Sequence, residues 1–311
     1  TLLISTKCFS SSLQGDPNVK KISNYIVKKV AEALKKLNKK DRSRYESIWD
    51  DIGLFVKYGS VSDTKFDELM RERVLFKNND GKYQTISEYQ EAIPADYKDK
   101  MEGKVLYYEK GKANASLLAQ LKEVGISAVE TDDHIDPHFI QHTEAHKVGD
   151  KEIKFSSVDS EIENILGTEN TTEDDIKVKE MFAKFLEIET PKEGDAPANE
   201  EIEIAKIKNS TTPAYFKVDE QMKRFGHMAK GMGQNAMFPV KKTLVINPQN
   251  GLIQNALKIH NNGKNEPLAK KICLHVQDLA NLSSEGLEED QRQVFVQRSQ
   301  DLIQELSNLA L

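Results

Sequence analysis

Apolar residues recur every three or four positions between residues 16 and 59, and this spacing predicts two consecutive helices. Asp16 offers an N-cap and Pro17 fits the first helical turn. The apolar positions of the first helix are Val19, Ile22, Ile26, Val30, Ala33 and Leu37. Those of the second are Tyr45, Ile48, Trp49, Ile52, Phe55 and Val56. The second run stops before Gly59, as a helix with a C-terminal glycine does. We therefore expect an amphipathic helix pair that packs together.

Short apolar runs alternate with helical periods between residues 104 and 166. Strands are expected at 105–108, 126–130 and 153–158, and helices at 113–124, 136–146 and 159–166. Strands that alternate with helices indicate a small parallel sheet.

The remaining chain predicts a helix at 173–187, strands at 202–207, 214–218 and 244–246, and two final helices that begin at Pro267 and Asp290. Residues 187–200 contain prolines and acids without an apolar period, which is typical of an exposed hinge. We place a domain boundary near Gly167, which gives domains 1–167 and 168–311. The fold class is then mixed α+β and α/β: a helical segment and a small parallel α/β subdomain, followed by an α+β domain that ends in a helical hairpin.

The two final helices share a long apolar stripe that needs a partner surface. Its expected contact residues are Leu268, Ile272, Val276, Leu279, Phe295, Leu302, Ile303 and Leu306. The stripe either pairs with a second copy of the chain or folds back on the sheet of the same chain.

Methionines gather between residues 222 and 237, which include four of the seven in the chain, and Met222, Phe225, Met228 and Met232 are spaced three or four apart as on a helix. The candidate binding residues here are Met222, Phe225, Met228, Met232, Met237 and Phe238. Methionine is flexible and polarisable, so such a cluster suits a surface that accepts many apolar partners. The alternative is that these side chains simply pack in the core.

Composition narrows the class of protein. The chain has 311 residues, 30% charged residues and a net charge of -6, which argues against general nucleic-acid binding. Mean hydropathy is -0.59, and no apolar run approaches the roughly 20 residues of a membrane span. Cys8 and Cys273 are too few and too far apart for a disulfide scaffold. A cytoplasmic protein without nucleic-acid or membrane partners is expected.

Four histidines spaced by four, His134, His138, His142 and His146, are the sharpest chemical candidate. Imidazoles at that spacing on one helix face can chelate zinc or nickel. The zinc protease pattern places a glutamate directly after the first histidine, whereas Glu144 comes two residues after His142. A solvated, histidine-rich helix face with no metal is the preferred interpretation. No motif for acid/base or nucleophilic catalysis was found.

Several segments resemble one known family. Leu13 and Gln14 precede the segment NVKKISNYIVKKV, which is followed by RYESIWDDIGLFVKYG and KNNDGKYQTISEY. These segments resemble the middle domain of the heat shock protein 90 family, closest to its bacterial HtpG branch, and the resemblance continues over nearly the whole chain. It implies the later part of a chaperone: part of the middle domain, then the C-terminal domain, without the N-terminal ATPase domain.

The resemblance also implies functional roles. In the intact family ATP and Mg are bound, and Gln14 would be a remnant of the ATP contacts. Ser10 stands where the family has an arginine that reaches the ATP phosphate, so we expect neither catalysis nor a cofactor in this chain. The methionine-rich helix would contact partly folded client proteins. The final helices would form a homodimer through a four-helix bundle. Because the sequence ends at Leu311 without the acidic tail of eukaryotic cytosolic members, no docking of tetratricopeptide co-chaperones is expected.

Three hypotheses follow from these patterns. The first is a dimeric chaperone segment that binds partly folded clients without catalysis. The second is a metal-binding α/β protein that uses the four histidines, and the third is a purely structural dimerisation module.

Overall fold

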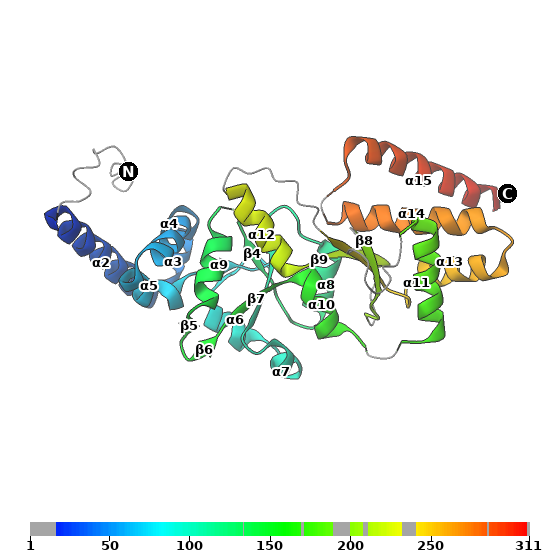
Figure 1. Cartoon of the computed structure of the whole chain (residues 1–311). Helices are drawn as coiled ribbons and strands as arrows, with labels where there is room; N and C mark the ends of the chain where they lie inside the picture. Colours follow the sequence, from blue (N-terminus) through cyan, green and yellow to red (C-terminus); the bar gives the residue numbers. More distant parts are fainter. Residues whose placement is uncertain are drawn as a thin grey trace, which may run out of the picture.

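The computed structural model describes residues 17–132, 134–168, 171–188, 200–207, 211–231, 241–284 and 286–309. Figure 1 shows an N-terminal helical segment at one end, a central α/β subdomain, and a C-terminal sheet with its helices at the other end. Helices and small sheets are mixed along the chain, which confirms the predicted fold class. Within the described part of the chain, no helix has the length and apolar character needed to cross a bilayer.

The helical segment comprises α2 (Pro17–Lys40), α3 (Arg42–Ser47), α4 (Trp49–Ser62) and α5 (Thr64–Met70). The second predicted helix is therefore divided at Ile48, and the prediction that it ends before Gly59 is wrong, because α4 continues through Gly59. A Cβ atom on Gly59 would lie 2.9 Å from the ring of Phe66 in α5. The glycine thus allows α5 to approach α4 closely rather than ending the helix.

The buried face of α2 also differs from the prediction. Ala31 is fully buried, and Val27 and Leu34 pack against the core beside it. The predicted inward positions Val19, Ile22, Ile26, Val30 and Ala33 are exposed. The periodicity identified an apolar stripe correctly, but α3 and α5 contact a face of α2 that is rotated from it.

A hairpin and three short helical elements link the helical segment to the α/β subdomain. This link begins after the 3-10 turn η2 (Arg71–Arg73). Its elements are β1 (Phe76–Lys77), β2 (Tyr83–Gln84), α6 (Ile86–Ala92), η3 (Ala95–Tyr97) and α7 (Lys98–Met101). Thr85 and Glu88 form a capping box at the start of α6. Lys57 of α4 and Asp136 of the subdomain form a buried ion pair across the joint, at 2.5 Å.

The α/β subdomain contains the predicted parallel sheet. Its elements are β3 (Lys104–Glu109), α8 (Ala115–Glu123), β4 (Val129–Thr131), α9 (Asp136–Glu144), β7 (Lys154–Ser157) and α10 (Val158–Leu166). The strand order is β4-β3-β7, and both pairings are parallel, with Tyr107 opposite Val129 and Ser157. A small hairpin of β5 (Lys147–Val148) and β6 (Lys151–Glu152), which was not predicted, lies between α9 and β7. In the order β4-β3-β7, strand β7 is an edge strand of the parallel sheet.

The C-terminal part begins with α11 (Glu173–Leu186) and continues with β8 (Glu200–Ile204), β9 (Ala214–Val218), α12 (Glu220–Gly231) and β10 (Lys242–Ile246). Strand β10 is central, parallel to β8 and antiparallel to β9. It is followed by α13 (Gly251–Asn262), α14 (Glu266–Leu282) and α15 (Glu289–Leu309), so the predicted final hairpin is confirmed. Helix α13 was not predicted, although Asn250 caps its start and Gly263, with φ 63°, ends it.

The C-terminal sheet contributes to two hydrophobic cores, because successive side chains of a strand face opposite sides. Tyr215 and Val245 join the core of the α/β subdomain and helical segment. Phe216, Leu244 and Ile246 join a second core with α11, α13 and α14. The sheet is therefore packed on both faces and connects the two halves of the chain.

Candidate functional site

Helix α12 follows β9 directly and lies against the edge strand β7 of the α/β subdomain. Its first turn is held by Asp219, whose side chain accepts the backbone N–H groups of Gln221 at 2.9 Å and Met222 at 3.1 Å. Strand β7 pairs with β3 through one set of its backbone groups, so the other set points toward α12. This arrangement brings the charged side chains of α12 to an open sheet edge.

The outward backbone groups of β7 are bonded by side chains. Ser157 donates its N–H to Glu220 of α12 at 3.0 Å, and the carbonyl of Phe155 accepts a guanidinium N–H of Arg224 at 2.9 Å. The N–H of Phe155 donates to Glu144 at the end of α9, at 2.8 Å. Three side chains therefore take the place of a neighbouring strand on this edge.

Further ion pairs reinforce the contact between α12 and the subdomain. Arg224 pairs with both carboxylate oxygens of Glu144, one of them at 2.9 Å. The hydrogen bond with Glu144 raises the pKa of Arg224 above its ordinary value, so the guanidinium stays charged. Lys223 lies 2.6 and 2.7 Å from the two oxygens of Asp159 and 2.9 Å from the hydroxyl of Ser157.

Tyr107 of β3 adds a hydrogen bond from the interior of the sheet. Its hydroxyl donates to Glu220 at 2.7 Å. Burial, and then the negative charge of Glu220, raise the pKa of Tyr107 above its usual range, so the phenol keeps its proton and remains a donor.

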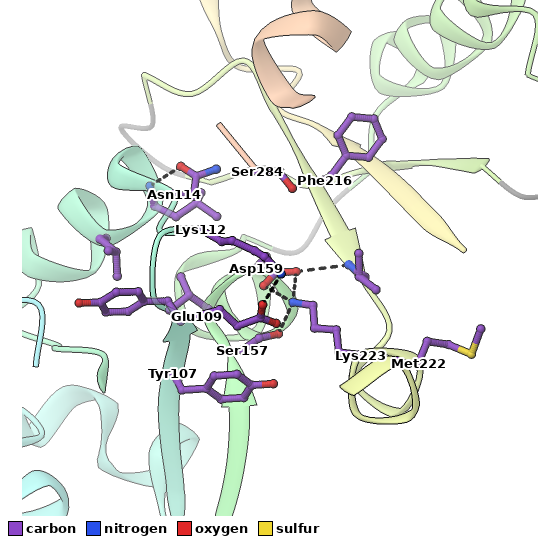
Figure 2. A pocket seen from close by; sticks show the side chains of 16 residues that line it. Tyr107, Glu109, Lys112, Asn114, Ser157, Asp159, Phe216, Met222, Lys223 and Ser284 are labelled. Carbon is purple, nitrogen blue, oxygen red and sulfur yellow. Dashed lines mark hydrogen bonds and ion pairs between the residues drawn. The ribbon is translucent and has the colours of Figure 1, made fainter. Parts of the chain in front are cut away.

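A cavity of about 190 Å³ lies between α12, the α/β subdomain and β9. In Figure 2, Lys223 points toward Asp159 and Ser157, whereas Met222 points away from them. Apolar side chains make much of the lining: Tyr108, Leu117, Leu118, Phe216, Val218 and Met222. A cavity of about 150 Å³ can hold benzene, so this one can hold a single large apolar side chain.

Only one of the two predicted binding residues of α12 whose side chains the structure describes lines this cavity. Met222 lines it, and Phe225 is 50% exposed on the surface of the helix. The side chain of Met228 and the residues Met232, Met237 and Phe238 lie outside the described residues, as do Gln14 and Ser10.

The predicted contact residues of the final hairpin divide into three groups by burial. Ile272 and Val276 are buried in the second hydrophobic core of the same chain, and Leu268 and Leu302 are half-buried and pack against it. Leu279 is half-buried, and Phe295 is half-buried and stacks on the ring of His275, 5.3 Å away. Ile303 and Leu306 of α15 are 64% and 63% exposed, and Val294 and Val296 of the same helix are also exposed.

The four histidines do not converge on one point. His134 precedes α9, and His138 is exposed on it. The rings of His142 and His146 are 4.4 Å apart, and His142 lies 3.2 Å from the carboxylate of Asp67 in α5. In the part of the chain that the structure describes, no three His, Cys, Asp or Glu residues form a group that could hold a metal. The geometry gives the metal-binding hypothesis no support.

The charged side of α12 was not recognised in the sequence. Glu220, Lys223 and Arg224 are spaced three and four apart, so they share a helix face, and this spacing was a visible signal. Their partners Glu144 and Asp159 lie more than sixty positions away in sequence, where no local pattern connects them.

Comparison with known proteins identifies the family. The family model described as Hsp90 protein matches residues 10–310. The chaperone protein htpG of Bacteroides fragilis is 28% identical over 254 residues, which is 79% of this chain and 37% of that protein. The chaperone protein HtpG of Porphyromonas gingivalis is 31% identical over 255 residues, 79% of this chain and 36% of that protein. The chaperone protein HtpG of Clostridium botulinum is 30% identical over 198 residues, 61% of this chain and 30% of that protein.

The chain therefore spans little more than a third of the length of the first two relatives. The family match nevertheless extends along almost its whole length, which confirms the resemblance drawn from the sequence segments. The chain belongs to the Hsp90 family.

Proposed function

We propose that this chain holds partly folded proteins at α12 and dimerises through α15, without catalysis of its own. The observation that carries the proposal is the pair of apolar side chains on α12: Phe225 is half exposed, and Met222 lines a cavity of about 190 Å³. An exposed aromatic residue on a helix that also lines a cavity for one apolar side chain suits an unfolded segment better than a small polar substrate. The names of the relatives, all chaperone proteins, support the same proposal.

Client holding is tested by suppression of aggregation of a chemically unfolded protein, with light scattering as the readout. Phe225→Ser is expected to reduce suppression strongly. The matched control is Ile176→Ser on α11, because Ile176 is 52% exposed and Phe225 is 50% exposed. Equal suppression by the original chain and by Phe225→Ser would contradict holding at α12 and favour the structural dimerisation module.

Dimerisation is assigned to the outer face of α15. Ile303 and Leu306 are one turn apart and exposed, and the exposed Val296, seven residues before Ile303, lies on the same side of the helix. Truncation before α14 is a poor test, because Ile272 and Val276 belong to the core of the chain.

The test of dimerisation is sedimentation equilibrium of the full chain at micromolar concentration. A dimer is expected, and the double variant Ile303→Ser/Leu306→Ser should be a monomer, while Ile176→Ser remains a dimer. A monomeric original chain would contradict this part of the proposal.

Holding by this chain is also proposed to be independent of ATP and Mg, which the intact family binds. The aggregation assay with and without Mg-ATP should give the same suppression, and no phosphate should be released. Stimulation by Mg-ATP would overturn this point.

A further inference from the structure

We propose that Glu220, Lys223 and Arg224 are positioning residues, which dock α12 on the open edge of β7 and so fix Phe225 and Met222 for client binding. The inference rests on the proposed function of α12. Beyond that function, it names the side chains that set the orientation of α12 through contacts with the edge of a sheet.

The geometry of α12 separates two faces. With about 100° of rotation per residue, Glu220, Lys223 and Arg224 lie within roughly 100° of one another. Met222 and Phe225 lie on the opposite side of the helix. Docking of the charged face on β7 therefore directs the apolar face away from the sheet edge.

The bonds to β7 replace those of a missing strand. An edge strand has outward N–H and C=O groups that need partners. Ser157 donates to Glu220, and the carbonyl of Phe155 accepts from Arg224, so two of these groups are satisfied by α12 itself. A helix whose side chains complete a backbone ladder is held in one register along the strand.

The partner groups are partly buried, which makes the docking stronger than a surface contact. The side chains of Lys223 and Asp159 are only 16% and 21% exposed. Exposed ion pairs contribute little, but charged hydrogen bonds with restricted water access contribute more. Removal of Arg224 would leave the carboxylate of Glu144 without its bidentate partner.

Docking is expected to matter for binding because a fixed helix requires less ordering when a client binds. Loss of the docking contacts should weaken client affinity about tenfold, since several side chains of α12 would then have to be ordered by the client.

The test compares variants of the full chain in two assays: hydrogen exchange of peptides that cover α12 and β7, and affinity for a fluorescently labelled unfolded protein. Lys223→Met and Arg224→Met should speed exchange in both peptides and weaken affinity about tenfold. Arg224→Lys keeps the charge but loses the fork of donors, so it should lie between Arg224→Met and the original chain. Lys217→Met, which removes ion pairs with Glu203 of the C-terminal sheet and with Glu163 of α10, should change neither assay.

Exchange of β10 distinguishes positioning from general destabilisation, since it should stay unchanged in all variants. Unchanged exchange of α12 and β7 in Arg224→Met would overturn the docking. Faster exchange with unchanged affinity, in a chain where Phe225→Ser does weaken affinity, would overturn the positioning role. If Phe225→Ser leaves affinity unchanged, the proposed function fails instead, and the docking is then judged by exchange alone.

Discussion

The ion pair between Lys57 and Asp136 offers a quantitative test of how the helical segment is attached to the α/β subdomain. Lys57 lies in α4 and Asp136 opens α9, and the two side chains are 10% and 2% exposed. The ammonium group of Lys57 also lies 4.7 Å from the ring centre of Phe76. Lys57→Met keeps most of the apolar stem and removes only the charge.

The expected loss in the free energy of unfolding depends on the buried carboxylate of Asp136, which remains without its partner. Removal of one partner of a buried ion pair costs about 3–5 kcal/mol, because the other charge stays buried without compensation. The second oxygen of Asp136 still accepts the N–H of Asp132 at 2.8 Å, so we expect the lower end, about 3 kcal/mol. In the double variant Lys57→Met/Asp136→Asn no charge remains, and the cost should fall to about 1 kcal/mol.

Urea unfolding followed by circular dichroism measures these differences. Lys29→Met is the control, because Lys29 pairs with Glu32 on the surface of α2, and its unfolding midpoint should not change. A loss below about 1 kcal/mol for Lys57→Met, or a double variant less stable than the single one, would refute the reasoning. The pair would then be well solvated, and attachment would depend on apolar contacts alone.

Three further predictions concern single side chains. Burial raises the pKa of the Cys273 thiol to about 12, so alkylation of this thiol should be far slower in the folded chain than in the unfolded chain, as measured by mass spectrometry of its peptide. Because the thiol ionises at lower pH in the unfolded chain, the free energy of unfolding should fall as pH rises from 9 toward 12. Burial lowers the pKa of His275, so the unfolded chain binds the proton more readily, and the urea concentration at the unfolding midpoint should fall as pH drops below about 6.5. The variant His275→Phe can still stack on Phe295 and should show a smaller pH dependence. Gly59→Ala should cost about 1 kcal/mol in urea unfolding instead of stabilising α4, because its Cβ would lie 2.9 Å from the ring of Phe66.

Local patterns predicted most of the elements. The parallel sheet was predicted because its strands are short apolar runs between helical periods, and the structure places β3, β4 and β7 close to the expected ranges. Helix α13 was missed although Asn250 and Gly263 are ordinary helix signals, so this error was avoidable. The domain boundary near Gly167 stays a prediction.

Gly59 and the exposed residues of α2 could not have been predicted locally. Whether a glycine ends a helix or admits a neighbour depends on Phe66, which belongs to the next helix. Likewise a stripe such as Val19 and Ile22 identifies a helix but does not say which elements cover it. Both errors come from tertiary packing that the spacing of residues does not encode.

The two sides of α12 illustrate the same limit for the site. The apolar side was recognised because methionine and phenylalanine recur at a helical period, and that period is local. The charged side resembled an ordinary solvated face, since nothing near Arg224 in sequence indicates a partner. Glu144 is 80 positions away, and it becomes a neighbour only because α9 and β7 are assembled in the same subdomain. The half-exposed Phe225 contributes little burial energy, so the orientation of α12 has to come from polar contacts. The partners in those contacts are distant in sequence, and the spacing of residues along α12 therefore does not reveal them.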